Sequence, residues 1–214
     1  MRFFFHHFYH EFAWTYDIVA AIVSIGRWNR WVRVAVPFLV EPNILEIGFG
    51  PGHLQAYLLA NGQLTVAGLD ESRQMASLTN QRLKRDGLEP IKLARGKAQD
   101  LPFASESFDT AVSTFPSEYI FEERTIREVH RILRKGGRFV VVPAASIVGR
   151  SLTDRAAAWL FRVTHQAPAS RREILTSRLE RSLEAAGFEP EFDTVETHSS
   201  VVYIVIARKT LARP

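Results

Sequence analysis

The chain has 214 residues, of which 46% are hydrophobic and 23% are charged, so it is long enough for one sizeable α/β domain and too apolar for a mainly disordered protein. It contains no cysteine, which excludes disulfides, cysteine-ligated zinc, iron–sulfur clusters and thiol nucleophiles and suits a reducing cytoplasm. Its formal net charge of +4 comes from basic residues spread through nearly every segment, which argues against a nucleic-acid partner.

Residues 1–40 are predicted to form an N-terminal helical cover for the functional site. They hold neither the ~20 apolar residues of a spanning helix nor the apolar core and cleavage site of a signal peptide. Their aromatic side chains can pack on the core, line an apolar pocket or rest in a membrane interface beside arginines, so peripheral membrane contact stays open. His6, His7, His10 and Glu11 have the spacing of metal ligands, but we expect no metal. The aromatic residues are Phe3, Phe4, Phe5, Phe8, Phe12, Trp14, Trp28 and Trp31, and the arginines are Arg27, Arg30 and Arg33.

From Asn43 onward, short β-branched or apolar runs alternate with helical patterns, which is typical of a parallel sheet with crossover helices. Residues 41–143 are therefore expected to form the binding core. Gly136 and Gly137 are predicted to end its third helix. The predicted strands are Asn43–Ile47, Gln63–Leu69, Ile91–Ala94, Thr110–Thr114 and Arg138–Val142, and the predicted helices are His53–Ala60, Ser72–Asp86 and Glu122–Arg134.

The C-terminal part adds an insertion, a helix and two strands. Residues 144–169 are predicted to be an insertion on the substrate side of the core. Ser170 and Glu173 form a capping box that opens a helix, which Gly187 ends, within the C-terminal unit 170–214. Strands follow near Glu189–Glu196 and Val201–Arg208. The whole pattern predicts a single Rossmann-like domain over 1–214: a doubly wound, mostly parallel seven-stranded sheet with helices on both faces and an antiparallel strand near the C-terminus.

A glycine-rich loop joins the first predicted strand to the first predicted helix. Its glycines, Gly48, Gly50 and Gly52, permit positive φ and a close approach of ligand to backbone. A dinucleotide-binding loop would have the spacing G-x-G-x-x-G, whereas His53 stands where the third glycine of that motif belongs. The loop therefore indicates a different nucleotide-like ligand.

Asp70 ends the second predicted strand, eighteen residues after Gly52. A carboxylate at that position can accept hydrogen bonds from both hydroxyls of a ribose. The ligand is thus expected at the carboxyl ends of the strands. Asp109, by contrast, is expected to anchor a turn before the fourth strand and not to touch ligand.

Four motifs follow one another over about residues 43–143. They are E-x-G-x-G-x-G at Glu46 to Gly52, G-x-D-x-S-x-x-M at Gly68, Asp70, Ser72 and Met75, L-P-F…S-F-D at Leu101 to Phe103 and Ser107 to Asp109, and E-x-x-R-x-L-[RK]-x-G-G at Glu128, Arg131, Leu133, Arg134, Gly136 and Gly137. Together they resemble the class I S-adenosylmethionine-dependent methyltransferases. The resemblance is to the small-molecule branch that includes the ubiquinone/menaquinone C-methyltransferases.

This resemblance implies a role for each matching position. Glu46 and the loop backbone would hold the methionine moiety of S-adenosylmethionine, and Asp70 would hold its ribose. Thr114 and Phe115 would lie beside the reactive methyl, and Tyr16, with Asp17 after it, resembles a Tyr-Asp pair that covers the donor. The implied donor-binding set is Tyr16, Glu46, Gly48, Phe49, Gly50, Gly52, Asp70, Glu71, Met75, Lys97, Ala98, Gln99, Thr114 and Phe115.

The adenine end of that set departs from the family at one position. Glu71 and Met75 would border the adenosine, and Ala98 and Gln99 would face the adenine. Lys97 stands where the family often has an acid or an amide. A side chain that accepts a hydrogen bond from the adenine amino group is therefore not expected there.

The implied chemistry needs no metal, because the sulfonium of the donor already makes its methyl electrophilic. The protein then has to align a nucleophile for in-line SN2 displacement and exclude water. A carbon acid or a phenol as acceptor would also need a base. The candidate bases are Tyr16, Glu118, Tyr119 and His165, each of which has an equally ordinary role in packing or at the surface.

Aromatic residues in both covering segments suggest a small apolar or aromatic acceptor, such as a quinone precursor, a lipid-like molecule or another metabolite. The reaction would yield S-adenosylhomocysteine. An alternative is a module that binds S-adenosylmethionine or S-adenosylhomocysteine without turnover, as a sensor or a partner protein, and the departure at Lys97 favours it. Methylation of protein or nucleic acid is a third hypothesis, less favoured because the Asp/Asn-Pro-Pro-Tyr/Phe motif is missing after the fourth strand, where the chain has Ser113 to Ser117.

Overall fold

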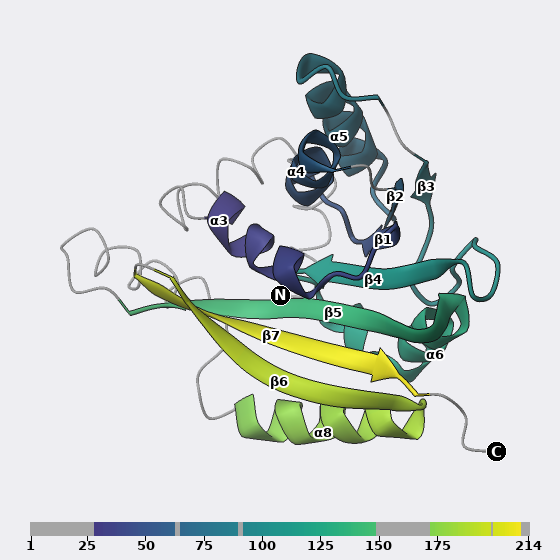
Figure 1. The fold of residues 1–214 in the computed structure, drawn as a ribbon, viewed down its shortest axis with the longest axis vertical. Helices are drawn as coiled ribbons and strands as arrows, with labels where there is room; N and C mark the ends of the chain where they lie inside the picture. Colours follow the sequence, from purple (N-terminus) through teal and green to yellow (C-terminus); the bar gives the residue numbers. More distant parts are fainter. Residues whose placement is uncertain (1–27, 63–64, 90–91, 149–171, 198, 211–214) are drawn as a thin grey trace, which may run out of the picture.

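The computed structural model describes residues 28–62, 65–89, 92–148, 172–197 and 199–210, with residues 172–178 as backbone only. Within them lies a seven-stranded sheet with the strand order β3-β2-β1-β4-β5-β7-β6 (Figure 1). The pairs are parallel except those of β7, which runs antiparallel to β5 and β6. The strands are β1 Asn43–Ile47, β2 Thr65–Asp70, β3 Leu93–Arg95, β4 Phe108–Thr114, β5 Leu133–Ile147, β6 Phe188–Thr197 and β7 Ser200–Lys209.

Helices cover both faces of the sheet, which confirms the predicted doubly wound, mostly parallel fold. One apolar cluster packs Trp31 and Leu54 against strand residues such as Val140. The cluster on the opposite face packs Ile126 and Leu183 against the alternate strand residues. The helical elements are α3 Trp28–Val32, η1 Arg33–Phe38, α4 His53–Asn61, α5 Arg73–Arg85, η2 Glu118–Phe121, α6 Glu123–Ile132 and α8 Arg172–Ala185.

The carboxylate of Asp109 joins the starts of the two central strands β1 and β4. It accepts hydrogen bonds from the backbone N–H of Asn43 at 3.0 Å and from Nδ2 of Asn43 at 2.8 Å. Arg134 binds both of its oxygens, at 2.8 and 2.9 Å. These hydrogen bonds lower the pKa of Asp109 although burial raises it. Asp109 therefore has a structural role, but it lies inside β4 and not in the predicted turn before that strand.

The helix before β5 is shorter than predicted. α6 ends at Ile132, because Leu133 has extended backbone angles and pairs with Phe108 of β4. Gly136 and Gly137 lie inside β5, where Gly136 has a φ of 75°. The prediction that these two glycines end the helix was therefore wrong.

β5 is also longer than the predicted Arg138–Val142. Residues 144–147 continue the strand and pair with β7 as far as Ile147, which lies opposite Ser200. The register shifts between Val141 and Ala144, where Pro143 has no N–H for the ladder. Residues 144–147, the start of the predicted insertion, therefore lie in the sheet, because an antiparallel partner keeps the chain there.

Several predicted features lie outside the described residues. They include most of the N-terminal cover, the insertion from residue 149 onward, and Tyr16, His165 and Ser170. The division of the chain at residues 40, 143 and 169 stays a prediction. Among the described helices, none has the length and apolar character needed to cross a membrane.

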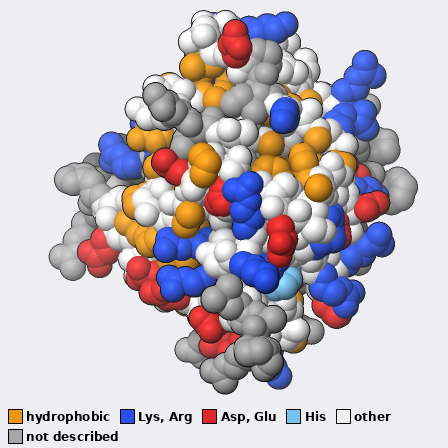
Figure 2. All heavy atoms as spheres, turned by 45° about the vertical axis from the view of Figure 1, so that its right-hand side comes forward, with side chains coloured by type: hydrophobic (Ala, Val, Ile, Leu, Met, Phe, Trp, Pro, Cys, Tyr) orange, Lys and Arg blue, Asp and Glu red, His pale blue; other side chains and the backbone are white. Residues whose placement is uncertain are grey.

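Charged residues of both signs are dispersed over the face shown in Figure 2. Lys and Arg side chains lie among acidic side chains there, with small hydrophobic areas between them. This matches the dispersal of basic residues along the sequence. The net charge of +4 is thus not concentrated into one basic surface on this face.

A buried lysine at the end of β7 holds the end of α6. Lys209 Nζ donates to the carbonyls of His130 and Leu133, at 2.9 and 2.7 Å, which the end of the helix leaves without intrahelical partners. The His130 ring lies beside them and packs edge-on against Phe188 at 5.2 Å. Burial and the Lys209 charge both lower the pKa of His130.

We expect the stability of the fold to fall as the pH drops below about 6.5, the ordinary value for histidine. Because the pKa of His130 is lowered in the folded state, the unfolded chain binds this proton first. The stability linked to His130 is then complete above the unfolded pKa and is lost as the pH falls toward the folded pKa. Urea unfolding of the wild type and of His130→Gln at several pH values between about 7.5 and 5.5 tests this. Identical pH dependence in both proteins would contradict it.

Candidate active site

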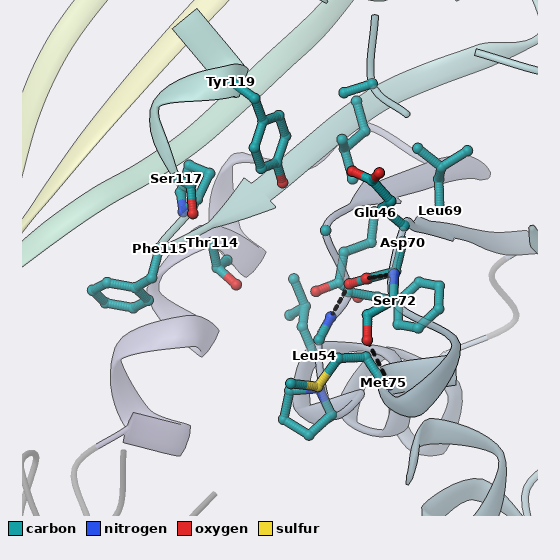
Figure 3. A pocket seen from close by; sticks show the side chains of 18 of the residues that line it. Glu46, Leu54, Leu69, Asp70, Ser72, Met75, Thr114, Phe115, Ser117 and Tyr119 are labelled. Atoms are coloured by element: carbon teal, nitrogen blue, oxygen red, sulfur yellow. Dashed lines mark hydrogen bonds between the residues drawn. The ribbon is translucent and has the colours of Figure 1, made fainter. Parts of the chain in front are cut away.

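A cavity of about 480 Å³ lies where β1, β2 and β4 end (Figure 3). The last residues of these strands, Ile47, Asp70 and Thr114, all line it. β1 pairs with β2 on one side and with β4 on the other, so the strand order reverses there. Such a switch point, at the carboxyl ends of the strands, is where open α/β sheets bind ligands.

The glycine loop after β1 forms one wall of the cavity. Gly48 has a φ of 73°, and its N–H donates to the carbonyl of Leu69 at 2.7 Å. A side chain at Gly48 would collide with the Tyr119 hydroxyl, which approaches from the far side of the cavity. Glycine is therefore required at this position both for the backbone conformation and for the space that Tyr119 uses.

Asp70 connects the glycine loop to the start of α5. Its Oδ2 accepts the N–H of Gly50 at 2.9 Å, and its Oδ1 accepts the N–H of Ser72 at 2.8 Å. Burial raises the pKa of Asp70, and these two backbone hydrogen bonds oppose the rise. Each carboxylate oxygen has a further lone pair, so Asp70 can still accept hydrogen bonds from a ligand.

Glu46 is a buried acid in the cavity wall, only 1% exposed. Its Oε2 has no hydrogen-bond partner among the described residues. Burial raises the pKa of Glu46 to about 8, a hydrogen bond with Gln55 opposes that rise, and the charge of Asp70 adds to it. Two acids that share one cavity favour a ligand that brings positive charge and hydrogen-bond donors.

The wall on the other side of Asp70 contains the residues that the sequence assigned to adenosine. Met75 is buried against Phe49, and Ala98 is buried as well. Lys97 Nζ lies 3.8 Å from a carboxylate oxygen of Glu71, and both side chains are largely exposed. The Gln99 amide donates to Glu122 at 2.9 Å. This wall therefore presents both a hydrogen-bond donor, Lys97, and a hydrogen-bond acceptor, Glu71.

Aromatic rings form the wall at the end of β4. Phe115 has a φ of 50°, which is unusual for a residue with a side chain, and such strain is typical of functional sites. Its ring lies 4.5 Å from that of Trp28 and 6.1 Å from that of Trp31. Val32 completes this side of the cavity. The wall beside Thr114 is thus apolar, whereas the wall beside Glu46 is acidic.

A partly buried ion pair fixes the segment that follows the adenosine wall. Glu128 accepts the N–H of Leu101 at 2.8 Å and pairs with Arg131 at 2.8 Å. Arg131 in turn donates to the carbonyls of Leu101 and Phe103, at 2.9 and 2.8 Å. Glu128 and Arg131 of the fourth motif therefore bind the chain backbone and do not line the cavity.

Most of the predicted donor residues lie in this one cavity. Gly52, at the start of α4, does not line the cavity, because it packs against Thr79 of α5. Of the candidate bases, Tyr119 lines the cavity, Glu118 is exposed and does not line it, and Tyr16 and His165 lie outside the described residues. The predicted residues that line the cavity are Glu46, Gly48, Phe49, Gly50, Asp70, Glu71, Met75, Lys97, Ala98, Gln99, Thr114 and Phe115.

Sequence reasoning did not assign several residues that line the cavity. Ser72 had a signal, since it is the N-cap of α5 and accepts the N–H of Met75. His53 had one too, as the first residue of the helix after the glycine loop. Val32 and Leu54 had none, because an apolar residue in a cavity wall has the same sequence pattern as one in the core. The unassigned residues are Val32, Ile47, Pro51, His53, Leu54, Leu69, Ser72, Gly96, Pro116 and Ser117.

Comparison with known proteins agrees with this geometry. Residues 45–141 match the family described as "Methyltransferase domain". This range begins in β1 and ends in β5, so it includes the glycine loop, Asp70 and the end of β4. It contains all the predicted donor residues that line the cavity.

Individual relatives match over part of the chain. A demethylmenaquinone methyltransferase of Symbiobacterium thermophilum is 30% identical over 149 residues, which are 65% of this chain and 59% of that protein. A phosphatidylethanolamine N-methyltransferase of Cereibacter sphaeroides is 37% identical over 101 residues, 46% of this chain and 49% of that protein. The chain therefore spans between about half and three fifths of the length of these relatives.

A solved structure extends the likeness of the fold to nearly the whole chain. A putative S-adenosyl-L-methionine-dependent methyltransferase from Methanococcus maripaludis superposes with a TM-score of 0.65 at 17% identity, and the match covers 94% of this chain and 91% of that one. The strand order, the cavity at the switch point and the matched domain lead to the same assignment. Residues 45–141 are therefore similar to a methyltransferase domain, and the strand order agrees with that similarity.

Proposed function

We propose that the chain transfers a methyl group from S-adenosylmethionine to a small apolar or aromatic acceptor, such as a quinone precursor or a lipid-like molecule. The observation that carries this proposal is the contrast between the two sides of one cavity. One side has the acids Glu46 and Asp70, and the other has the rings of Trp28 and Phe115. A zwitterionic, positively charged donor suits the first side, and an uncharged acceptor suits the second.

The hydrogen-bond acceptors on the acidic side of the cavity fit S-adenosylmethionine. Glu46 Oε2 is a buried acceptor without a partner among the described residues, and the ammonium group of the methionine moiety is a donor that would satisfy it. Asp70 would accept from the ribose hydroxyls while it still holds Gly50 and Ser72. The bound donor supplies an electrophilic methyl on a sulfonium, and the protein supplies position and a dry environment.

The apolar side would orient the acceptor and exclude water. The Phe115 ring is held by Trp28 and by a strained backbone, so it offers a rigid surface beside Thr114. Burial of an acceptor on this surface removes water from both reactants. Residues 1–40 are also rich in aromatic side chains, so peripheral membrane contact stays open for them beside packing on the core or lining the acceptor pocket.

Tyr119 is the candidate base that this arrangement favours. Its hydroxyl points into the cavity between the acidic and apolar sides (Figure 3). From there Tyr119 Oη can accept a hydrogen bond from an acceptor hydroxyl, and in its phenolate form it would take up the proton of that hydroxyl during transfer. Glu118, the neighbouring acid, is exposed and does not line the cavity.

Incubation of the pure protein with deuterated S-adenosylmethionine and a cell extract tests the proposed function. Mass spectrometry should find the label in a small apolar or aromatic product. Binding of the donor without any labelled product would favour a sensor that does not turn over. Label found only in protein or nucleic acid would contradict the proposed acceptor class.

We expect Glu46→Gln to weaken the binding of S-adenosylmethionine about 10- to 100-fold, because a hydrogen bond between charged groups becomes one with a neutral amide. Titration calorimetry measures the affinity. Glu123→Gln is the matched control, since Glu123 is an exposed residue of α6 that pairs with Arg127. Equal loss of affinity in both variants would contradict a role for Glu46 in donor binding.

The same site should release a proton when it binds the donor at neutral pH. The pKa of Glu46 is raised to about 8, so below that pH the free protein holds Glu46 protonated, whereas an ammonium group favours its carboxylate. Affinity should therefore rise as the pH increases toward about 8. Calorimetry in buffers with different ionisation enthalpies measures the released proton, which should be missing in Glu46→Gln.

We expect Phe115→Ala to reduce methyl transfer at least ~10-fold while the affinity for S-adenosylhomocysteine changes by less than about threefold. The acceptor surface is lost in this variant, but the acidic side of the cavity is intact. Phe192→Ala is the matched control, because Phe192 is an exposed aromatic residue on β6, at the far edge of the sheet. Loss of donor affinity equal to the loss of transfer would contradict separate donor and acceptor sides.

A further inference from the structure

Two carbonyls of the glycine loop, those of Gly50 and Pro51, are held by side chains of α5. Thr79, a fully buried residue of α5, donates its hydroxyl to the carbonyl of Gly50 at 2.7 Å. The same side chain packs so closely on Gly52 that a Cβ there would collide with it. Thr79 therefore contacts two of the three loop glycines, Gly50 and Gly52, on the side of the loop that faces α5.

Arg82, one helical turn further along α5, holds the next part of the loop. Its Nε donates to the carbonyl of Pro51 at 2.7 Å, and its NH2 lies 3.3 Å from Nε2 of His53. Because arginine has only donors, the Nε2 atom of His53 acts as the acceptor in this contact. Arg82 thus fixes both the loop and a histidine that lines the cavity.

The loop is consequently held on two sides. On the cavity side the Gly50 N–H is bound by Asp70, and on the other side the Gly50 carbonyl is bound by Thr79. α5 is itself fixed to Asp70, since the N–H of Ser72, its N-cap residue, donates to Oδ1. Asp70, α5 and the loop therefore form one closed set of contacts.

We propose that Thr79 and Arg82 are positioning residues for the donor site. Neither side chain lines the cavity, so both act through the loop. They hold its peptide units in the donor-binding arrangement before the donor arrives, which removes an ordering cost from binding. This inference rests on the proposed function, because the ligand whose affinity it concerns is S-adenosylmethionine or S-adenosylhomocysteine.

Thr79→Val removes the hydroxyl and keeps the shape of the side chain. We expect it to weaken the binding of S-adenosylhomocysteine about tenfold, and we expect Thr79→Ser to restore most of the affinity. Thr125→Val is the matched control: Thr125 is a fully buried threonine of α6 whose hydroxyl has no partner among the described residues. Calorimetry well below the unfolding temperature of each protein gives the affinities.

Arg82→Met gives an independent test in case Thr79→Val fails to fold. Its control is Arg85→Met on the same helix, because Arg85 is exposed and pairs with Asp86. We expect weaker binding in the first variant and wild-type binding in the second. Wild-type affinity in both Thr79→Val and Arg82→Met would overturn the inference.

Amide hydrogen exchange of the free proteins provides a readout that needs no ligand. The amides of Gly50, Gly52 and His53 should exchange faster in Thr79→Val than in the wild type and in Thr125→Val. If the wild type bound neither S-adenosylmethionine nor S-adenosylhomocysteine, the proposed function would fail while the exchange data still reported on the loop. Unchanged exchange of the loop amides in Thr79→Val would overturn the inference whether or not the wild type binds.

Discussion

The arrangement of the site depends on the Asp70 carboxylate. It is bound at once to the loop that follows β1 and to the first turn of the helix that follows β2. Parallel neighbours such as β1 and β2 end at the same edge of the sheet, but their connections are otherwise independent. The Asp70 side chain accepts hydrogen bonds from both connections and so joins them into a single rigid surface. The wall of the cavity that would bind the donor is part of this surface.

The buried acids make the free site unfavourable in a way that a ligand can relieve. A buried acceptor without a partner costs about 1–3 kcal/mol, and Glu46 Oε2 is such an atom among the described residues. Burial and the nearby Asp70 charge keep its pKa near 8, so the free protein avoids part of this cost through protonation. The affinity for the donor, the charge of Glu46 and the release of its proton are therefore coupled at this one residue of β1.

The sequence predicted the parts of the molecule whose pattern is local. β1 and the loop after it were predicted correctly because a short, mainly apolar run followed by regularly spaced glycines has few alternative structures. The length of β5 was not, since its continuation past Pro143 depends on pairing with β7, which lies about 60 residues further along the chain. The same limit applies to Thr79 and Arg82, whose partners lie 29 and 31 residues earlier in the chain.

The contact between Gly48 and Tyr119 couples two positions that lie far apart in the sequence. The tyrosine hydroxyl occupies the space that any larger residue at position 48 would need. Replacement of Gly48 therefore meets two obstacles, and a smaller residue at position 119 would remove only this steric one, because the φ of 73° would still be strained. A library that randomises position 48 should therefore return almost only glycine, even where position 119 holds a smaller residue.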